Sequence, residues 1–322
     1  MLNKIDRIDR GILYALDTNA RQSAQQIARS VDVSKEVVQY RIKRLERAKV
    51  IEGYYTLIDY ATLGYVTIMR VYLKLQNEDD KVRNQMIDEL AENPGTVFVY
   101  STDFAWDIVI GFPMRTIKEG EHNLQNFAGK YRRHIANIGI SFLSELIYYP
   151  RKYLSPSKVA EVESVSTGVG KVQDLNRSDL KLLKLIARDA KVPVVKLAQQ
   201  LNLTSSAVIY KLRRLEKEGV ILAYKVFIDF NKLGYEYYKV DVELEDYSLK
   251  HRMQSFLRRH PNVIYENRMV GGSDLEFDVE VPAYEDFVKL GEELKATFPQ
   301  KIRSYTFYRA RKMFKALVFP QA

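Results

Sequence analysis

Residues 34–51 read SKEVVQYRIKRLERAKVI, and residues 204–221 read TSSAVIYKLRRLEKEGVI. Each stretch begins with a hydroxyl side chain, Ser34 or Thr204, that can cap the start of a helix. Apolar residues then recur at helical spacing, which predicts an amphipathic helix with one buried stripe. The opposite face is rich in Lys and Arg in both stretches. The sequence therefore predicts the same basic-faced helix twice in one chain.

The two helices belong to a longer internal repeat. The segments that match at an offset of 170 residues include Leu45-Glu46 with Leu215-Glu216, Val50-Ile51 with Val220-Ile221, and Leu63-Gly64-Tyr65 with Leu233-Gly234-Tyr235. The register holds without a gap from about residue 5 to about residue 75, and matches sustained at one offset indicate a duplicated module. The stretch at 151–171, with its Ser, Val and Gly residues, is typical of a linker between the copies.

Positive charge is concentrated around the two helices. Residues 1–55 hold 11 Lys and Arg against 7 Asp and Glu, and residues 171–225 hold 12 against 5. These windows carry +4 and +7, which together exceed the net charge of +9 for the whole chain. The rest of the chain is slightly acidic, so a polyanion is the expected partner of these two segments in particular.

The composition excludes several classes of protein. With 46% apolar and 28% charged residues, the 322-residue chain is typical of a globular protein with room for several small domains. No apolar run approaches the roughly 20 residues that span a bilayer, and the N-terminus lacks the apolar stretch of a secretory signal, so no membrane partner is expected. The absence of cysteine excludes disulfides, thiolate metal ligands and cysteine nucleophiles. We expect no cofactor and no metal site.

The segment that precedes each basic helix predicts two further short helices, at 6–17 and 23–31 in the first copy. Three helices followed by short strands at 51–59 and 221–229 are typical of winged helix-turn-helix domains, here at 1–60 and 172–230. The third helix of such a domain fits the major groove of DNA, where its first residues reach base edges and later cations meet phosphates. The residues predicted to contact double-stranded DNA are Ser34, Lys35, Gln39, Tyr40, Lys43, Arg44 and Arg47 in the first copy, and Thr204, Ser205, Ser206, Tyr210, Arg213, Arg214 and Lys217 in the second.

The remaining part of each module, at 61–150 and 231–322, shows strand-like alternation interrupted by two amphipathic helices. In the first copy the predicted elements lie at 66–75, 82–93, 96–101, 106–112, 116–130 and 138–146. In the second they lie at 237–244, 248–259, 263–270, 275–281, 284–297 and 305–319. The order β-α-β-β-α-β predicts a ferredoxin-like domain, and the fold class of the chain is α+β. A small open sheet of this kind pairs readily with a second sheet.

With these residues, the chain resembles the Lrp/AsnC (feast/famine) family of prokaryotic regulators, in a tandem form similar to archaeal members. The resemblance rests on the two helix-turn-helix segments and on the wing that ends in Asp59 and Leu63-Gly64, repeated as Asp229 and Leu233-Gly234. It implies a transcription regulator that acts on the chromosome in the cytoplasm. It also implies self-association through the ferredoxin-like sensor sheets, within one chain or between chains, and a small-molecule effector such as an amino acid.

The two copies depart from the family pattern in different ways. Lys49 stands where Gly219 occupies the position after the basic helix in the second copy, so the first lacks the residue suited to a left-handed cap. The family's glycine-containing turn survives as Gly271-Gly272-Ser273-Asp274 but reads Phe104-Ala105-Trp106-Asp107 in the first copy. The resemblance implies that the effector meets Gly271, Gly272, Asp274 and Asp107. Because Glu36 opens the first basic helix and Ser206 the second, we expect tighter DNA binding by the second copy.

Two other functions compete with this interpretation. Siroheme decarboxylases are similar to this chain in architecture and also occur as tandem fusions. They rely on His and Arg near a tetrapyrrole carboxylate. The four histidines here, His122, His134, His251 and His260, form no motif with a partner, and Asp pairs such as Asp103 with Asp107 or Asp274 with Asp278 are typical of solvated turns. We therefore assign no catalytic residue and expect no enzyme activity. The third alternative is an architectural DNA-binding protein without an effector, in which most of the 22 tyrosines occupy strands and interfaces.

Overall fold

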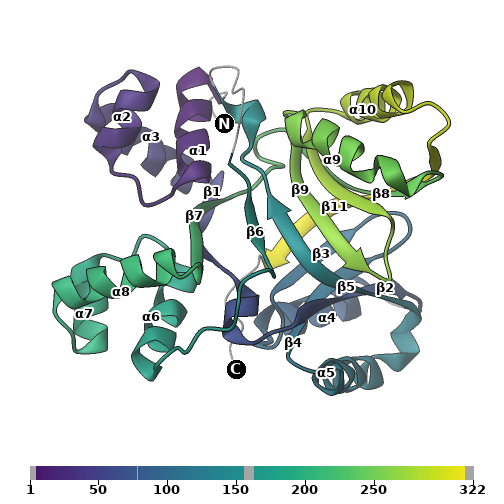
Figure 1. Ribbon diagram of the computed structural model, residues 1–322, viewed down its shortest axis with the longest axis horizontal. Helices are drawn as coiled ribbons and strands as arrows, with labels where there is room; N and C mark the ends of the chain where they lie inside the picture. Colours follow the sequence, from purple (N-terminus) through teal and green to yellow (C-terminus); the bar gives the residue numbers. More distant parts are fainter. Residues whose placement is uncertain (1–4, 78, 156–162, 316–322) are drawn as a thin grey trace.

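The computed structural model describes residues 5–77, 79–155 and 163–315, which form two helical domains beside one large sheet (Figure 1). Residues 156–162 of the expected linker and residues 316–319 of the last expected strand lie outside the described residues. The order of the elements confirms two tandem modules, each with three helices followed by an α/β domain. Within the described residues, no helix combines the length and hydropathy that crossing a membrane requires.

The three-helix domains have matching bounds in the two copies. They are α1 (Arg7–Thr18), α2 (Ala24–Val31) and α3 (Lys35–Arg47), and α6 (Arg177–Arg188), α7 (Val194–Leu201) and α8 (Ser205–Lys217). The predicted caps of the basic helices are present, because the hydroxyls of Ser34 and Thr204 accept hydrogen bonds from the third backbone amide of α3 and α8. Each domain thus begins its third helix in the way that the sequence predicts.

The wing strands of the two copies pair with each other. Strand β1 (Ile51–Ile58) runs antiparallel to β7 (Ile221–Ile228), and together they form a separate two-stranded ribbon. Each helical domain packs against the strand of the other copy: Thr56 Oγ1 on β1 donates to the carbonyl of Ile186 on α6 at 2.7 Å. In return, the amide of Ala20, after α1, donates to the carbonyl of Tyr224 on β7 at 2.8 Å. The ribbon therefore ties the two helical domains to one another.

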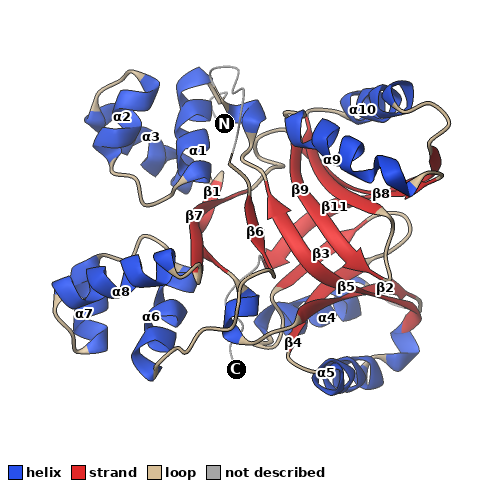
Figure 2. Cartoon of the chain, viewed as in Figure 1, coloured by secondary structure: helices blue, strands red, loops and turns tan. Residues whose placement is uncertain are grey.

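Both α/β domains show the predicted β-α-β-β-α-β order. The first contains β2 (Thr67–Leu75), α4 (Asp80–Glu92), β3 (Phe98–Thr102), β4 (Ile108–Met114), α5 (Ile117–Lys130) and β5 (Ile135–Tyr148). The second contains β8 (Glu236–Leu244), α9 (Lys250–Arg259), β9 (Val263–Val270), β10 (Leu275–Val281), α10 (Tyr284–Thr297) and β11 (Ile302–Lys315). Figure 2 shows the helices on the outer side of the sheets.

The two sheets join into one closed barrel. The strand order is β2-β4-β3-β11-β8-β10-β9-β5, and β5 pairs again with β2, so eight antiparallel strands form a ring. The long last strands make the joints: β5 pairs with β2 along its first part and with β9 along its last part, while β11 pairs with β8 and then with β3. A short strand, β6 (Val165–Thr167), adds to β5 outside the ring. The sheet pairing expected from the sequence thus occurs within one chain.

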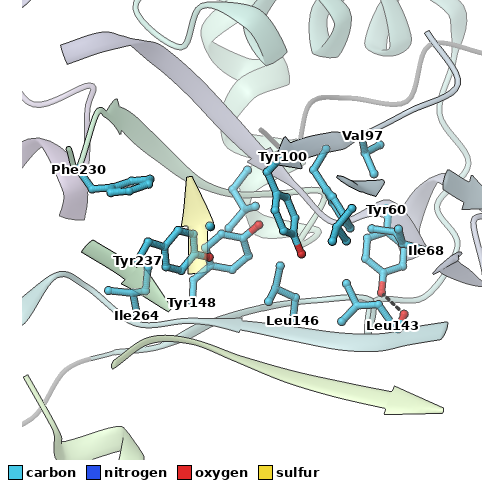
Figure 3. Packing of buried hydrophobic residues seen from close by; sticks show 14 of the residues in the cluster. Tyr60, Ile68, Val97, Tyr100, Leu143, Leu146, Tyr148, Phe230, Tyr237 and Ile264 are labelled. Carbon is cyan, nitrogen blue, oxygen red and sulfur yellow. Dashed lines mark hydrogen bonds between the residues drawn. The ribbon is translucent and has the colours of Figure 1, made fainter. Parts of the chain in front are cut away.

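Alternation along the strands separates an outer core from the barrel interior. On β3, Val99 packs outward with the residues that α4 and α5 cover, while Tyr100 points inward with Tyr148 and Tyr237. Figure 3 shows these three rings close together inside the barrel. Because side chains alternate along a strand, each barrel strand contributes to both cores.

The described part of the linker is packed into the structure. Leu154 is buried in the core of the first helical domain, and the backbone amides of Gly168 and Gly170 donate to the carboxylate of Asp59 at the end of the wing. Arg151 lies half-buried between the two halves, with Nη1 2.8 Å from Asp17 on α1 and Nε 2.8 Å from Glu280 on β10. The linker therefore contributes contacts that hold a helical domain against the barrel.

Candidate nucleic-acid interface

Most of the residues predicted to contact DNA lie on the exposed faces of α3 and α8. Tyr40 and Tyr210, which occupy equivalent positions, are 66% and 69% exposed. The other exposed members of the predicted set are Ser34, Lys35, Gln39, Lys43 and Arg47 on or beside α3, and Thr204, Ser206, Arg213 and Lys217 on or beside α8. Ser205 is half-buried at the first position of α8. Both helices thus present hydroxyl, aromatic and cationic groups to solvent on one side, and α3 adds the amide of Gln39.

Arg44 and Arg214 are placed differently from the rest of the set. The side chain of Arg44 is only 30% exposed and forms an ion pair with Asp9 on α1, a carboxylate with no exposed surface. Arg41 contacts the same carboxylate at 3.0 Å. In the second copy, Arg214 pairs with Asp179 in the same way. These arginines hold the third helix against the first, and any contact they make with DNA stays a prediction.

Asp179 combines two structural tasks. Its backbone amide and its carboxylate form a capping box with Asn176 at the start of α6, and Lys211 Nζ lies 2.8 Å from the same carboxylate. Burial alone would raise the pKa of Asp179, but hydrogen bonds and charge from Lys211 and Arg214 hold it below its usual value. The carboxylate is therefore ionised at neutral pH. Sequence inspection missed this group, although Asp9 and Asp179 are matched by the repeat offset.

Each third helix is also fixed to the wing strand that follows it. The hydroxyl of Tyr54 on β1 donates to Glu46 at 2.7 Å, and that of Tyr224 on β7 donates to Glu216 at 2.6 Å. Because β1 and β7 pair, these bonds connect α3 to α8 through the ribbon. The connection gives the two exposed basic faces a defined relative position.

The turn between the third helix and the wing has the same conformation in both copies. Gly219 has a φ of 71°, and Lys49 has a φ of 58° at the matching position. The left-handed conformation is unfavourable for a residue with a Cβ atom, so Lys49 is held there by the surrounding contacts. The absence of glycine in the first copy therefore changes the energy of the turn and leaves its geometry unchanged.

Charge at the start of the two helices differs as the sequence indicates. Glu36 is fully exposed in the first turn of α3, where its own backbone amide and the hydroxyl of Ser34 lower its pKa. The carboxylate is therefore negative at neutral pH, close to the helix N-terminus. Ser206, its counterpart on α8, is exposed and uncharged. At the helix starts, an incoming phosphate would meet a repulsive group on α3 only.

The turns predicted to hold an effector lie at the β3–β4 and β9–β10 hairpins. Oδ2 of Asp107 accepts a hydrogen bond from the amide of Leu75 at 2.8 Å, and Oδ2 of Asp274 accepts one from Leu244 at 2.8 Å. Each carboxylate thus links its hairpin turn to the end of the neighbouring strand, β2 or β8. Gly271 has a φ of 73°, and Gly272 has no room for a Cβ atom beside the Glu276 carboxylate. Effector binding by these residues stays a prediction.

Known proteins match the same helical segments. Residues 5–46 match the AsnC-type helix-turn-helix domain, and residues 175–221 match a winged helix-turn-helix DNA-binding domain. The HTH-type transcriptional regulator Ptr1 of Methanocaldococcus jannaschii is 32% identical over 108 residues, which are 33% of this chain and 69% of that protein. An uncharacterized HTH-type transcriptional regulator of Pyrococcus abyssi is 32% identical over 118 residues, 37% of this chain and 73% of the relative.

A solved enzyme shares the fold of the whole chain. The crystal structure of the siroheme decarboxylase NirDL superposes with a TM-score of 0.62 at 13% sequence identity, covering 98% of this chain and 94% of that one. A second structure of that enzyme, in complex with an iron-uroporphyrin III analogue, superposes with a TM-score of 0.61. At this level of identity the similarity concerns the fold alone.

Proposed function

Since the chain belongs to the Lrp/AsnC family of helix-turn-helix transcriptional regulators, we propose that it binds a specific double-stranded DNA sequence with both of its third helices. A small molecule modulates this binding, and the protein acts on the chromosome in the cytoplasm. The observation that carries the proposal is the pair of exposed basic faces on α3 and α8, which the shared ribbon holds at a defined spacing.

Each helix has two kinds of contact in this proposal. The first turn, with Lys35 and Gln39 on α3 and Ser206 on α8, faces base edges in the major groove. The later cations Lys43 and Arg213 neutralise phosphates and set the register. Arg44 and Arg214 hold each helix in place through ion pairs with the buried aspartates Asp9 and Asp179. The exposed part of each arginine is also available to a phosphate.

Selection from random duplexes, followed by fluorescence anisotropy, tests sequence-specific binding. We expect an enriched site that binds at least 1,000-fold more tightly than a scrambled duplex, since specific sites commonly exceed non-specific DNA by about 10³ or more. Arg213→Ala should reduce the slope of log K against log salt by about 1, because one phosphate contact is lost. Lys289→Ala on α10, which removes a cation with a 67% exposed side chain, is the matched control and should leave the slope unchanged. An unselective protein, or equal slopes for both variants, would contradict the proposal.

The unequal helix starts predict an asymmetric DNA site. Exchanging the two residues separately, as Glu36→Ser and Ser206→Glu, tests this directly on the full chain. The first change should raise affinity and the second should lower it, because a carboxylate next to the phosphates is removed or introduced. Both variants keep a polar residue in the first turn. Equal effects of the two exchanges, in sign as well as size, would refute the asymmetry.

The enzymatic alternative depends on the shared fold with siroheme decarboxylase. Among the described residues, those that line a cavity inside the barrel include none of the four histidines. The relatives with substantial sequence identity carry the names of transcriptional regulators, which supports a non-enzymatic role. A visible-absorbance titration with iron uroporphyrin tests the alternative, since binding would shift the tetrapyrrole band. Within the DNA-binding proposal, a thermal-shift screen against amino acids separates an effector-controlled regulator from an architectural protein.

A further inference from the structure

The barrel interior contains a cavity that sequence inspection did not anticipate. Its volume is about 210 Å³, and its walls come from strands of both sensor domains, with β1 and β7 across one end. Eight-stranded barrels have interiors that are either filled by side chains or just large enough for one small ligand. A cavity of roughly 150 Å³ can hold benzene, so this one has room for a substituted aromatic ring.

The walls combine aromatic rings with charged side chains, and some of their polar groups have no partner. Tyr100 and Tyr148 are 4% and 3% exposed, and their hydroxyls make no hydrogen bond with any described residue. Nε of Arg70 is also unpaired, although the other nitrogens of this guanidinium bind Glu276 and Asn267 at 2.8 and 2.7 Å. An unsatisfied buried polar group costs about 1–3 kcal/mol. A ligand oxygen placed among these groups would satisfy them.

The mouth of the cavity carries both signs of charge. Glu52 on β1 and Asp229 after β7 supply the negative charge there, and Arg311 and Lys312 on β11 supply the positive charge. The amide of Asp229 donates to the carbonyl of Val50 at 3.0 Å, which places Asp229 beside the start of β1, and burial and Asp229 raise the pKa of Glu52. Neither Glu52 nor Lys312 forms an ion pair with a described residue, so both can meet a ligand. Paired carboxylates suit an ammonium group, and the cations suit a carboxylate.

We propose that the barrel cavity, rather than the hairpin turns, is the effector site, and that it takes an aromatic amino acid with the ring inside and the α-ammonium and α-carboxylate at the mouth. This inference deepens the proposed function and rests on it. The aromatic walls favour a planar ring, since ring–ring contacts add to the burial of apolar area. A phenol oxygen would reach the free hydroxyls, so L-tyrosine fits better than L-phenylalanine.

The position of the cavity connects it to the DNA-binding helices. Tyr55 on β1 and Val226 on β7 line it, and these strands form the ribbon on which both helical domains pack. Arg151, another lining residue, bridges Asp17 on α1 and Glu280 on β10. A ligand that contacts these residues changes the energy of the ribbon and of the bridge. Effector binding and DNA binding are therefore coupled, and the coupling is reciprocal.

Isothermal titration calorimetry on the full chain tests the site and the ligand class. We expect L-tyrosine to bind, and tyramine and 3-(4-hydroxyphenyl)propionate, which each lack one α-group, to bind at least tenfold more weakly. L-Leucine should also bind at least tenfold more weakly. Tyr148→Phe should weaken L-tyrosine but spare L-phenylalanine, because it removes one hydroxyl and keeps the ring. The matched control is Tyr305→Phe, which removes an unpartnered buried hydroxyl outside the cavity and should change neither affinity.

A second variant, Met313→Trp, fills the cavity from its lining and should abolish binding of L-tyrosine. Unchanged L-tyrosine affinity in both Tyr148→Phe and Met313→Trp would overturn the proposed site. If Asp274→Asn were the only variant to lose L-tyrosine binding, the ligand would lie at the hairpin turn, and the proposed site would be overturned as well. If none of the amino acids bound, or if iron uroporphyrin bound tightly, the assignment of an aromatic amino acid as the ligand would be overturned. DNA binding measured on the same preparation distinguishes these failures from failure of the proposed function, since only the latter predicts no selective duplex binding.

Discussion

Replacing Asp179 with asparagine isolates the ion pairs that hold α8 against α6. Asparagine keeps an oxygen that can accept the capping-box hydrogen bond from the backbone amide of Asn176, so the change removes the charge and little else. The aspartate side chain has no exposed surface, while Lys211 and Arg214 are 16% and 30% exposed. The two cations can regain water when the charge disappears, which limits the loss. The perturbation is therefore smaller than the breaking of a fully buried ion pair.

The expected loss follows from these exposures. A hydrogen bond to a charged group contributes about 1.5–3 kcal/mol, and a fully buried pair costs about 3–5 kcal/mol when one partner is removed. Since the cations of Asp179 are partly solvated, we expect a loss of about 2 kcal/mol, confined to the second helical domain. At about 1.36 kcal/mol per tenfold, local opening of α6–α8 should become about 30-fold more frequent.

Native-state amide hydrogen exchange measures this opening in the full chain, because it reports the stability of separate regions. Protection of α6–α8 should fall about 30-fold in Asp179→Asn, and protection of α1–α3 should fall in Asp9→Asn instead. Because the folded pKa of Asp179 is lowered, its contribution is present above pH ~4 and is lost as the pH falls further. The stability difference between variant and wild type should therefore close in acid. If the protection of α6–α8 changed by less than threefold at neutral pH, the reasoning would be refuted. These ion pairs would then contribute as little to stability as surface ion pairs do.

Four further changes have defined outcomes. Lys49→Gly should stabilise the protein by about 0.5–1 kcal/mol in chemical denaturation, because it relieves a left-handed lysine at some cost in chain entropy, and Gly219→Ala should do the opposite. Burial and the nearby carboxylate of Glu276 raise the pKa of Asp241, on β8, to about 7. The stability of the wild-type chain should therefore fall as the pH rises from about 4 to about 7. The melting temperature of Asp241→Asn should be flatter over this range, and parallel profiles would contradict the assignment. Arg151→Met removes the guanidinium that the buried carboxylates of Asp17 and Glu280 share and should destabilise the chain by about 3–5 kcal/mol, whereas a loss below 1 kcal/mol would show that the bridge is dispensable.

Local patterns were sufficient to predict the helices, the strands and their order. The basic faces of α3 and α8, the caps at Ser34 and Thr204, and the alternation along β3 all depend on neighbours within one or two turns or strand residues. The internal repeat then placed the same elements in the second half of the chain. For these features the sequence contains the relevant physics within short windows.

Long-range pairings explain what could not be predicted. The joints β3–β11 and β5–β9 connect residues of different modules, and no local period distinguishes them from pairing between two chains. The ion pairs of Asp9 and Asp179 link residues more than 30 positions apart, although their equivalence under the repeat was a usable signal. The cavity was missed for a similar reason: Tyr100 and Tyr148 look like ordinary strand tyrosines until the barrel closes around them.

Closure of the barrel within one polypeptide also changes how the protein responds to its own abundance. A regulator assembled from two identical chains loses its paired form on dilution, and its apparent stability depends on concentration. Here both joints are made by the covalently connected halves, so formation of the barrel is a first-order event. The occupancy of a single DNA site should therefore rise hyperbolically with the concentration of the protein, even when a cell contains only a few copies of the chain. Because the two halves are separate segments of one gene product, each recognition helix is also free to diverge while its companion stays the same.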